Sequence, residues 1–155
     1  MDKVELKNIF GYDTPDDSTA YLIVRISNLH QRRLNAKLSG LGLTFTQYVI
    51  LYGTYWLLYQ GQEVTQVTLG YLVKFDKSTV SSVVKTLITK KLVKRKEHPT
   101  DTRAKILSLT TNGVVLIEKA CEVVKQVDKE IFGENENNLT EMNKELLKIL
   151  RAYNE

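Results

Sequence analysis

Apolar residues recur three and four positions apart in six segments of the chain, and short polar or glycine-containing breaks separate these segments. Residues with this spacing share one face of a helix, so the pattern predicts a mainly helical protein. The segments expected to be helical are 19–38, 44–60, 65–73, 77–90, 110–132 and 139–153.

The two short helices in the middle of the chain form a recognisable unit. Only Lys74, Phe75 and Asp76 separate residues 65–73 from residues 77–90, and Asp76 is a favourable residue to begin the second helix. Two short helices joined by a three-residue turn are typical of a helix-turn-helix.

A polar segment that contains Pro99 and Asp101 separates two strand-like runs, residues 92–98 and 104–109. This arrangement predicts a β-hairpin after the helix-turn-helix, which together make a winged helix. The expected fold class is α+β, mainly α with a small hairpin.

We expect the chain to divide into three parts. Residues 1–38 form an N-terminal arm and the first dimerisation helix, residues 39–110 form a winged helix-turn-helix, and residues 111–155 form C-terminal dimerisation helices. The last part ends in an apolar seam with steps of 3, 4, 3 and 4, made by Leu139, Met142, Leu146, Ile149 and Tyr153. Such a seam requires a partner helix.

Positive charge is concentrated in one block. Residues 74–105 hold 10 basic and 3 acidic residues, a net charge of +7, whereas the whole chain carries +4. The flanking segments 1–73 and 106–155 carry 0 and −3. A block of this kind indicates a polyanion-binding surface, and the alternative is a solvated charged face.

Composition limits the other function classes. One cysteine excludes a disulfide framework within the chain, and 2 histidines without spaced acidic partners give no metal-site motif and no catalytic constellation. We therefore expect no enzyme activity, no metal and no cofactor. No apolar run approaches the roughly 20 residues of a membrane span, so a cytoplasmic protein with no membrane partner is expected.

Five short motifs follow one another from residue 43 to residue 113. They are Leu43-Thr44-x-x-Gln47-Tyr48-x-Ile50-Leu51, Asp76-x-Ser78-Thr79-Val80-Ser81, Leu92-Val93-x-Arg95, Asp101-x-Arg103 and Leu109-Thr110-x-x-Gly113. In this order and spacing the chain resembles the MarR family of bacterial transcription regulators. The resemblance implies a homodimer that carries a winged helix-turn-helix on each subunit and responds to a small ligand or to oxidation.

Two positions depart from the family pattern. Lys91 stands where the family usually has the glycine that ends the recognition helix, so a residue other than glycine must adopt the helix-ending conformation or the helix must end differently. Thr102 stands at the centre of the wing where an arginine is frequent, so the tip has one cation fewer.

The expected partner is double-stranded DNA, read as a pseudo-palindromic operator by a dimer, most simply as a repressor. Serine and threonine hydroxyls would approach bases, lysines would contact phosphates, Arg103 would reach the minor groove or its phosphates, and Asp101 would orient the wing. The DNA-contact candidates are Lys77, Ser78, Thr79, Ser81, Ser82, Lys85, Arg95, Lys96 and Arg103.

A candidate site for a small aromatic or phenolic effector combines a cation and phenol rings beside apolar rows. Its candidates are Arg25, His30, Tyr48, Tyr52 and Tyr55. The alternative is that these side chains serve only core and interface packing. Two further alternatives remain open, namely a redox switch through Cys121, and a winged-helix module that binds a protein without specific DNA binding.

Overall fold

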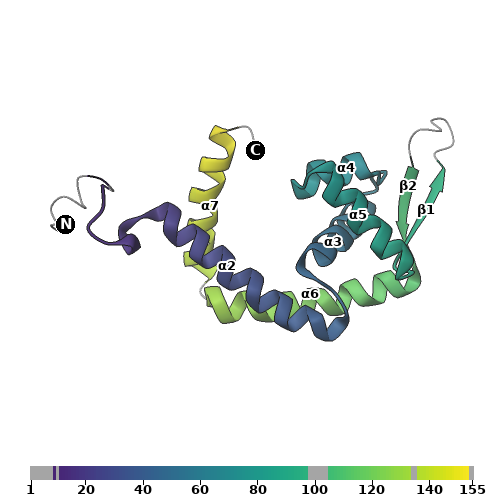
Figure 1. Ribbon diagram of the computed structural model, residues 1–155, viewed down its shortest axis with the longest axis horizontal. Coiled ribbons are helices and arrows are strands. Elements are labelled where there is room, and N and C mark those ends of the chain that lie inside the picture. The colour runs from purple at the N-terminus through teal and green to yellow at the C-terminus, as the bar shows by residue number, and fades with distance from the viewer. Residues whose placement is uncertain (1–8, 10, 98–104, 134–135, 154–155) are drawn as a thin grey trace.

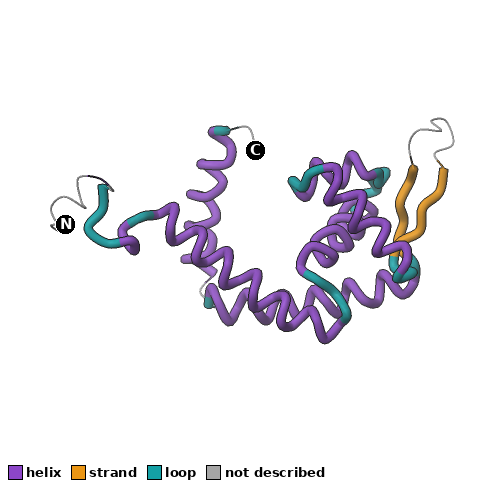
Figure 2. The backbone as a smooth tube through the Cα atoms, in the orientation of Figure 1, coloured by secondary structure: helices purple, strands orange, loops and turns teal. Residues whose placement is uncertain are grey.

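The computed structural model describes residues 9, 11–97, 105–133 and 136–153. After a 3-10 turn, Pro15–Asp17, come the long helix α2 and a second 3-10 turn, Ser39–Leu41. A compact winged unit follows, and the helices α6 and α7 end the chain (Figures 1 and 2). The main elements are α2 (Thr19–Leu38), α3 (Phe45–Tyr59), α4 (Gln66–Val73), α5 (Lys77–Thr89), β1 (Val93–Glu97), β2 (Lys105–Leu109), α6 (Thr111–Phe132) and α7 (Glu136–Ala152).

Local capping explains where the helices begin. Ser18, Thr44, Thr65, Asp76 and Thr110 each precede a helix, and their side-chain oxygens accept a hydrogen bond from a backbone N–H in its first turn. These bonds satisfy amides that lack a partner within the helix. The predicted helix-turn-helix and hairpin are both present, so the α+β winged-helix prediction is confirmed.

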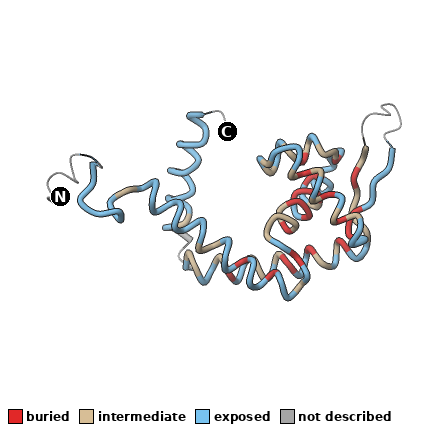
Figure 3. The backbone as a smooth tube through the Cα atoms, viewed as in Figure 1, coloured by how far each residue is buried: buried red, intermediate tan, exposed pale blue. Residues whose placement is uncertain are grey.

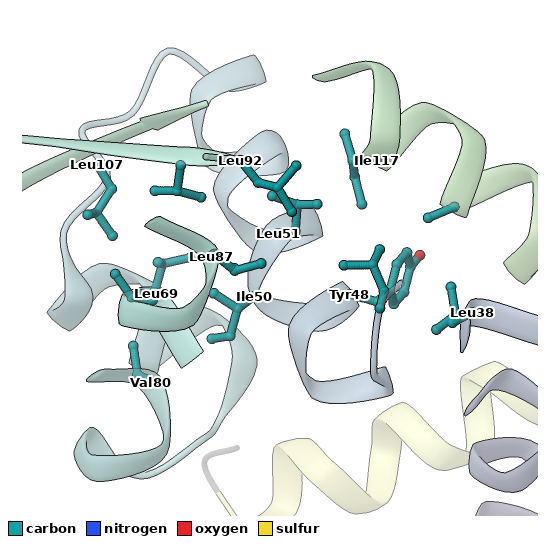
Figure 4. Packing of buried hydrophobic residues seen from close by; sticks show 14 of the residues in the cluster. Leu38, Tyr48, Ile50, Leu51, Leu69, Val80, Leu87, Leu92, Leu107 and Ile117 are labelled. Carbon is teal, nitrogen blue, oxygen red and sulfur yellow. The ribbon is translucent and has the colours of Figure 1, made fainter. Parts of the chain in front are cut away.

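The hydrophobic core lies inside the winged unit and extends onto α6. Ile50 and Leu51 of α3 meet Leu69 of α4 and Leu87 of α5 (Figure 4), and each is at most 1% exposed. Burial of each such side chain contributes on the order of 1.5–3 kcal/mol to the free energy of folding. Together the four side chains fix the helices of the unit against one another.

The hairpin is anchored at its base. β1 and β2 pair antiparallel with Val93 opposite Leu109 and Arg95 opposite Leu107. The amide of Leu107 also donates to the carbonyl of Val64 at 2.8 Å, so the segment before α4 supports the second strand. The tip, with the predicted residues Asp101 and Arg103, lies outside the described residues.

Gly113 marks a close approach between α6 and the start of the hairpin. A Cβ atom at this position would lie 2.1 Å from the carbonyl oxygen of Leu92. Because no side chain fits there, the glycine of the Leu109-Thr110-x-x-Gly113 motif has a steric reason. Thr110 secures the same junction, since its hydroxyl donates to the carbonyl of Lys91 at 2.8 Å.

The N-terminal half of α2 and nearly all of α7 are exposed (Figure 3). Among the α7 side chains that the structure describes, only Leu139 is partly buried. α7 begins at Glu136, ahead of the expected start at residue 139. No helix in the described part of the chain is long and apolar enough to cross a membrane.

Candidate nucleic-acid interface

Helix α5 presents a polar face to solvent and an apolar face to the core. Val80, Val84 and Leu87 are buried on the inner side. Most of the predicted DNA contacts of this helix are on the outer side, where Lys77, Ser78, Ser82 and Lys85 are exposed while Thr79 and Ser81 are half-buried. The burial pattern therefore leaves these side chains accessible to a ligand on the surface.

The start of α5 is fixed by Asp76. Its carboxylate accepts hydrogen bonds from the hydroxyls of Ser78 and Thr79 and from the backbone N–H of Thr79, the last two at 2.6 and 2.8 Å. These bonds, with that from Ser78 the strongest, hold the pKa of Asp76 well below its ordinary value. Both hydroxyl protons therefore point to Asp76.

The hairpin has two unlike faces. Arg95 and Glu97 share a face with buried Val93, whereas Lys94 and Lys96 lie on the opposite face, because side chains alternate along a strand. This agrees with the alternation expected from the sequence. Lys105 of β2 pairs with Glu97 at 2.6 Å, and that hydrogen bond lowers the pKa of Glu97.

α5 stands between two surface hollows. The first, which we call the α4–wing hollow, has a volume of about 700 Å³. It is lined by Thr65, Gln66, Val67, Gly70, Tyr71, Phe75, Lys77, Ser81, Arg95 and Lys105. The second, the α3–α5 hollow, has about 590 Å³ and is lined by Thr44, Thr46, Gln47, Ser78, Thr79, Ser82, Val83 and Thr86.

The two hollows bring together seven lining residues of α5, and five of these are predicted DNA contacts. Lys85 and Lys96 line neither hollow. The sequence analysis missed the contribution of α4 and of Lys105, because their proximity to α5 depends on tertiary packing.

Lys90 belongs to the basic block, but its ammonium donates to the carbonyl of Gly42 and to Gln47 at 2.6 and 2.8 Å. It thus connects the end of α5 to the start of α3.

The five effector candidates have different partners within the subunit. Arg25 is exposed, pairs with Asp16 at 2.7 Å and lies over the ring of Tyr21 at 5.4 Å. His30 lies 2.7 Å from Asp128 of α6, and its ring is 5.8 Å from that of Phe132. Asp16 and Tyr21 thus engage Arg25 near the start of α2, whereas the candidates Tyr48, Tyr52 and Tyr55 belong to α3.

Tyr48 lies at the junction of α3 and α6, where its hydroxyl meets the thiol of Cys121. Burial, followed by the influence of Cys121, raises the pKa of Tyr48 well above its ordinary value. Burial also raises the pKa of Cys121. A thiol with a raised pKa is a poor nucleophile at neutral pH, which disfavours the redox alternative.

The aromatic row of α3 continues from Tyr48 through Tyr52 and Trp56 to Tyr59, with ring centroids 5.9, 6.4 and 6.2 Å apart. Tyr55, which the sequence analysis grouped with these residues, packs instead against the core. Between α3 and α4 lies a small apolar cavity of about 240 Å³, the α3–α4 cavity. It is lined by Val49, Tyr52, Gly53, Trp56, Leu72 and Val73.

In the described part of the chain no group of three His, Cys, Asp or Glu side chains could hold a metal ion. The surface around α5 combines cations, hydroxyls and amides with exposed apolar side chains such as Val67 and Tyr71. This arrangement can contact a polyanion and donate or accept hydrogen bonds at its surface.

Comparisons with known proteins identify related chains. The family described as the ArnR1-like winged-helix domain matches residues 39–128. The HTH-type transcriptional regulator YdcH of Bacillus subtilis (strain 168) is 31% identical over 140 residues, covering 88% of this chain and 95% of that protein.

Solved structures share the fold along most of the chain. S. aureus MepR in complex with DNA has a TM-score of 0.78 and 26% identity, covering 87% of this chain and 98% of that one. Bordetella bronchiseptica BpsR, described in terms of regulation of its DNA binding by 6-hydroxynicotinic acid, has a TM-score of 0.73 and 25% identity. That match covers 84% of this chain and 96% of that one.

Proposed function

Because the chain belongs to the MarR family of winged helix-turn-helix transcription regulators, we propose that it binds a pseudo-palindromic operator as a homodimer. We further propose that it acts as a repressor and that a small aromatic ligand releases it from DNA. Members of the family are regulators and not enzymes, so the function rests on binding rather than catalysis.

The position of α5 between two hollows is the observation that carries the DNA-binding proposal. A helix with one exposed polar face fits the major groove of B-DNA, which is roughly 12 Å wide, and the hollows leave room for the phosphate strands on either side. Lys77 and Lys85 on α5 and Arg95 on β1 then supply phosphate contacts. Lys96 would do the same from the other face of the hairpin.

The hydrogen bonds of Asp76 indicate how two residues would read bases. Because Ser78 and Thr79 donate their hydroxyl protons to Asp76, their oxygens face a ligand as acceptors. Acceptors pair with the exocyclic amines of adenine and cytosine in the major groove. Ser81 and Ser82 keep both roles, so they tolerate either kind of base edge.

Exposed apolar side chains support the dimer. Met142, Leu146 and Ile149 on α7 are 40%, 39% and 53% exposed, and Leu22 and Ile26 on α2 are 37% and 43% exposed. The start of α2 and α7 lie at the same end of the molecule (Figure 1), and apolar side chains exposed along both require a covering surface. A second copy supplies the same two stripes.

The α3–α4 cavity is the candidate effector site. Its apolar lining and the rings of Tyr52 and Trp56 suit a single aromatic ring, although its volume lies below the roughly 300 Å³ of typical ligand pockets. A ligand here would push against α4, the first helix of the helix-turn-helix, and thereby move α5. The regulation of BpsR by 6-hydroxynicotinic acid is the analogy for this chemistry.

Salt-dependent DNA binding tests the main proposal. Lys85→Ala should weaken binding to operator and random duplexes alike and reduce the slope of log affinity against log salt by about one phosphate contact. Lys119→Ala, an exposed lysine on α6, is the control and should leave both unchanged. An unaltered slope in Lys85→Ala would contradict the assignment. Arg103→Ala should behave like Lys85→Ala.

Trp56 provides a direct probe of the ligand proposal because the chain has 1 tryptophan, and it lines the α3–α4 cavity. Aromatic acids at up to millimolar concentration should quench its fluorescence and weaken operator binding over the same concentration range. If the ligand quenched the Trp56 fluorescence without weakening operator binding, or released the protein from DNA without quenching it, the effector would bind elsewhere.

A further inference from the structure

The chain enters and leaves the winged unit beside the same end of α5. It enters through residues 39–44, which link α2 to α3, and it leaves through Thr110, which links β2 to α6. Lys90 and Lys91 directly follow α5, and each is hydrogen-bonded to one of these two connections. The C-terminal end of α5 is therefore the place where the winged unit is joined to α2 and α6.

The exit connection is closely packed. The hydroxyl of Thr110 donates to the carbonyl of Lys91 at 2.8 Å, and its backbone N–H donates to the carbonyl of Leu92 at 3.0 Å. Gly113 approaches Leu92 so closely that no Cβ atom fits between them. The start of α6 is thus held tightly against the residues that follow α5.

The backbone of the entry connection is less restrained. It contains Gly40 and Gly42, and a Cβ atom at either position would meet nothing within 4 Å. Gly42 has a φ of 68°, which glycine adopts without a steric cost. Because glycine populates a wider range of backbone angles than other residues, this connection depends on side-chain contacts to hold one angle.

Lys90 supplies such a contact from the end of α5. Its ammonium donates to the carbonyl of Gly42 at 2.6 Å and to the side-chain oxygen of Gln47 at 2.8 Å. Gln47 belongs to the capping box that begins α3. In the same turn, the backbone N–H of Phe45 donates to the side-chain oxygen of Asn35 on α2 at 2.8 Å. These bonds connect the end of α2, the start of α3 and the end of α5.

α2 and α6 form one support for the winged unit. They lie side by side (Figure 1), with His30 of α2 2.7 Å from Asp128 of α6 and Lys37 3.8 Å from Glu130. α5 has 13 residues and is therefore about 20 Å long. A rotation of roughly 10° about its C-terminal end would move its start by about 3 Å.

We propose that Lys90 is a positioning residue, whose bonds to Gly42 and Gln47 hold the winged unit at one angle to α2 and α6. The proposal rests on the proposed function, in which a homodimer reads two half-sites. In that dimer the angle fixes the distance between the two copies of α5, and this distance determines which half-site spacing the protein accepts. Lys90 thus contributes to specificity through the geometry of the protein and not through contact with DNA.

Operators with altered spacing test the effect on DNA binding. One base pair inserted between the half-sites of a selected operator moves one half-site by roughly 3.4 Å and turns it by about 35°. The insertion should weaken binding of the wild type roughly 100-fold and binding of Lys90→Met only about tenfold, because two hydrogen bonds are worth about one power of ten in an equilibrium. An equal penalty in the two proteins would contradict the proposal.

Two further variants separate positioning from charge. Lys90→Arg keeps the donors and should keep the wild-type spacing preference, and Lys119→Met, which removes an exposed lysine of α6, should keep it as well. The salt slope of Lys90→Met should equal that of the wild type, because the ammonium bonds to the protein. A slope lower by about one would make Lys90 a phosphate contact and overturn the proposal.

Distances within the free dimer test the same point without DNA. Because Cys121 is the 1 cysteine of the chain, a spin label at Ser82→Cys in a Cys121→Ser background places one label on each copy of α5. Pulsed electron–electron double resonance should give a broader distribution of label distances when Lys90→Met is added. Distributions of equal width would count against a positioning role.

Two results separate this inference from the proposed function. If the wild type dimerises and binds the operator, but Lys90→Met has the same spacing preference and the same distance distribution, the inference fails alone. If the wild type is a monomer or has no affinity for duplex DNA at low salt, the proposed function fails and the inference fails with it.

Discussion

Lys91 adopts a backbone conformation that side chains disfavour, with a φ of 57° directly after the recognition helix. Of the two expected alternatives, the structure therefore has the first, in which a residue other than glycine takes the helix-ending conformation. The left-handed region costs a residue with a Cβ atom roughly 1–2 kcal/mol. The cost is tolerated because the following amide, that of Leu92, donates to the carbonyl of Leu87 at 2.9 Å and closes the helix.

Replacement of Lys91 tests this strain. Lys91→Gly should raise the free energy of unfolding by about 1 kcal/mol, since glycine removes the Cβ clash but adds some chain entropy to the unfolded state. Lys91→Ala keeps the strain, removes the charge and should leave stability nearly unchanged. Chemical denaturation of the three proteins provides the comparison, and equal stabilities of Lys91→Gly and Lys91→Ala would argue against strain at this residue.

Asp76 should make the stability of the winged unit depend on pH. Its pKa in the folded protein is lowered by the hydrogen bonds from Ser78 and Thr79, so its ionised form stabilises the fold. That contribution is complete above the pKa of an unfolded aspartate and disappears as the pH falls through the folded pKa. Asp76→Asn keeps a capping group without the charge.

Unfolding of the wild type and of Asp76→Asn is therefore compared between neutral and acid pH. The wild type should lose more stability than Asp76→Asn as the pH falls below the ordinary aspartate range. Parallel losses in the two proteins would mean that the hydrogen bonds do not favour the ionised carboxylate.

At the scale of single residues, sequence patterns predicted caps and turns better than they predicted partners. Asp76 caps its helix as expected, because capping depends on neighbours within four residues. The partners of Arg25 and His30 were not predicted, because Asp16 and Asp128 meet them only after the chain has folded.

At the scale of elements, α3 illustrates the same limit. Tyrosines at 48, 52, 55 and 59 share a helical stripe in sequence, but the aromatic row of the structure passes through Trp56. Gly53 explains part of the difference. A Cβ atom there would lie 3.0 Å from Val73, so α4 approaches α3 closely beside Tyr52 and Trp56 and leaves Tyr55 on the core side.

Helix α7 carries the dimer proposal. Leu146→Asp places a charge in its apolar stripe and should weaken the homodimer roughly 100-fold or more, because an unpaired charge at such an interface costs several kcal/mol. Thr140→Asp adds the same charge at an exposed position on the polar side of the helix and is the control. Sedimentation equilibrium measures both, and an undiminished dimer in Leu146→Asp would exclude α7 from the interface.

At the scale of the whole molecule, the fold could be predicted from the sequence because each of its elements has a local signal. The order of the helices and the position of the hairpin follow from periodicity and turn residues. The two hollows beside α5 could not be predicted, because each combines residues of separate elements, such as Lys77 with Lys105. The division into dimerisation and DNA-binding parts stays a prediction.

The shape of the chain favours assembly. The core is confined to the winged unit and the adjoining parts of α2 and α6, while α7 and the start of α2 expose their apolar side chains (Figure 3). A monomer would leave these surfaces in water, whereas a twofold dimer covers them and sets two copies of α5 at a fixed spacing. We propose that this spacing reads an operator.

The most direct test is to select an operator from random duplexes and to titrate it with the protein near physiological salt. This titration gives the binding stoichiometry and, beside random DNA, the specificity. Two chains should bind each pseudo-palindromic duplex, roughly 1,000-fold or more tighter than random DNA of the same length. One chain bound to an asymmetric site, or equal affinity for selected and random DNA, would contradict it.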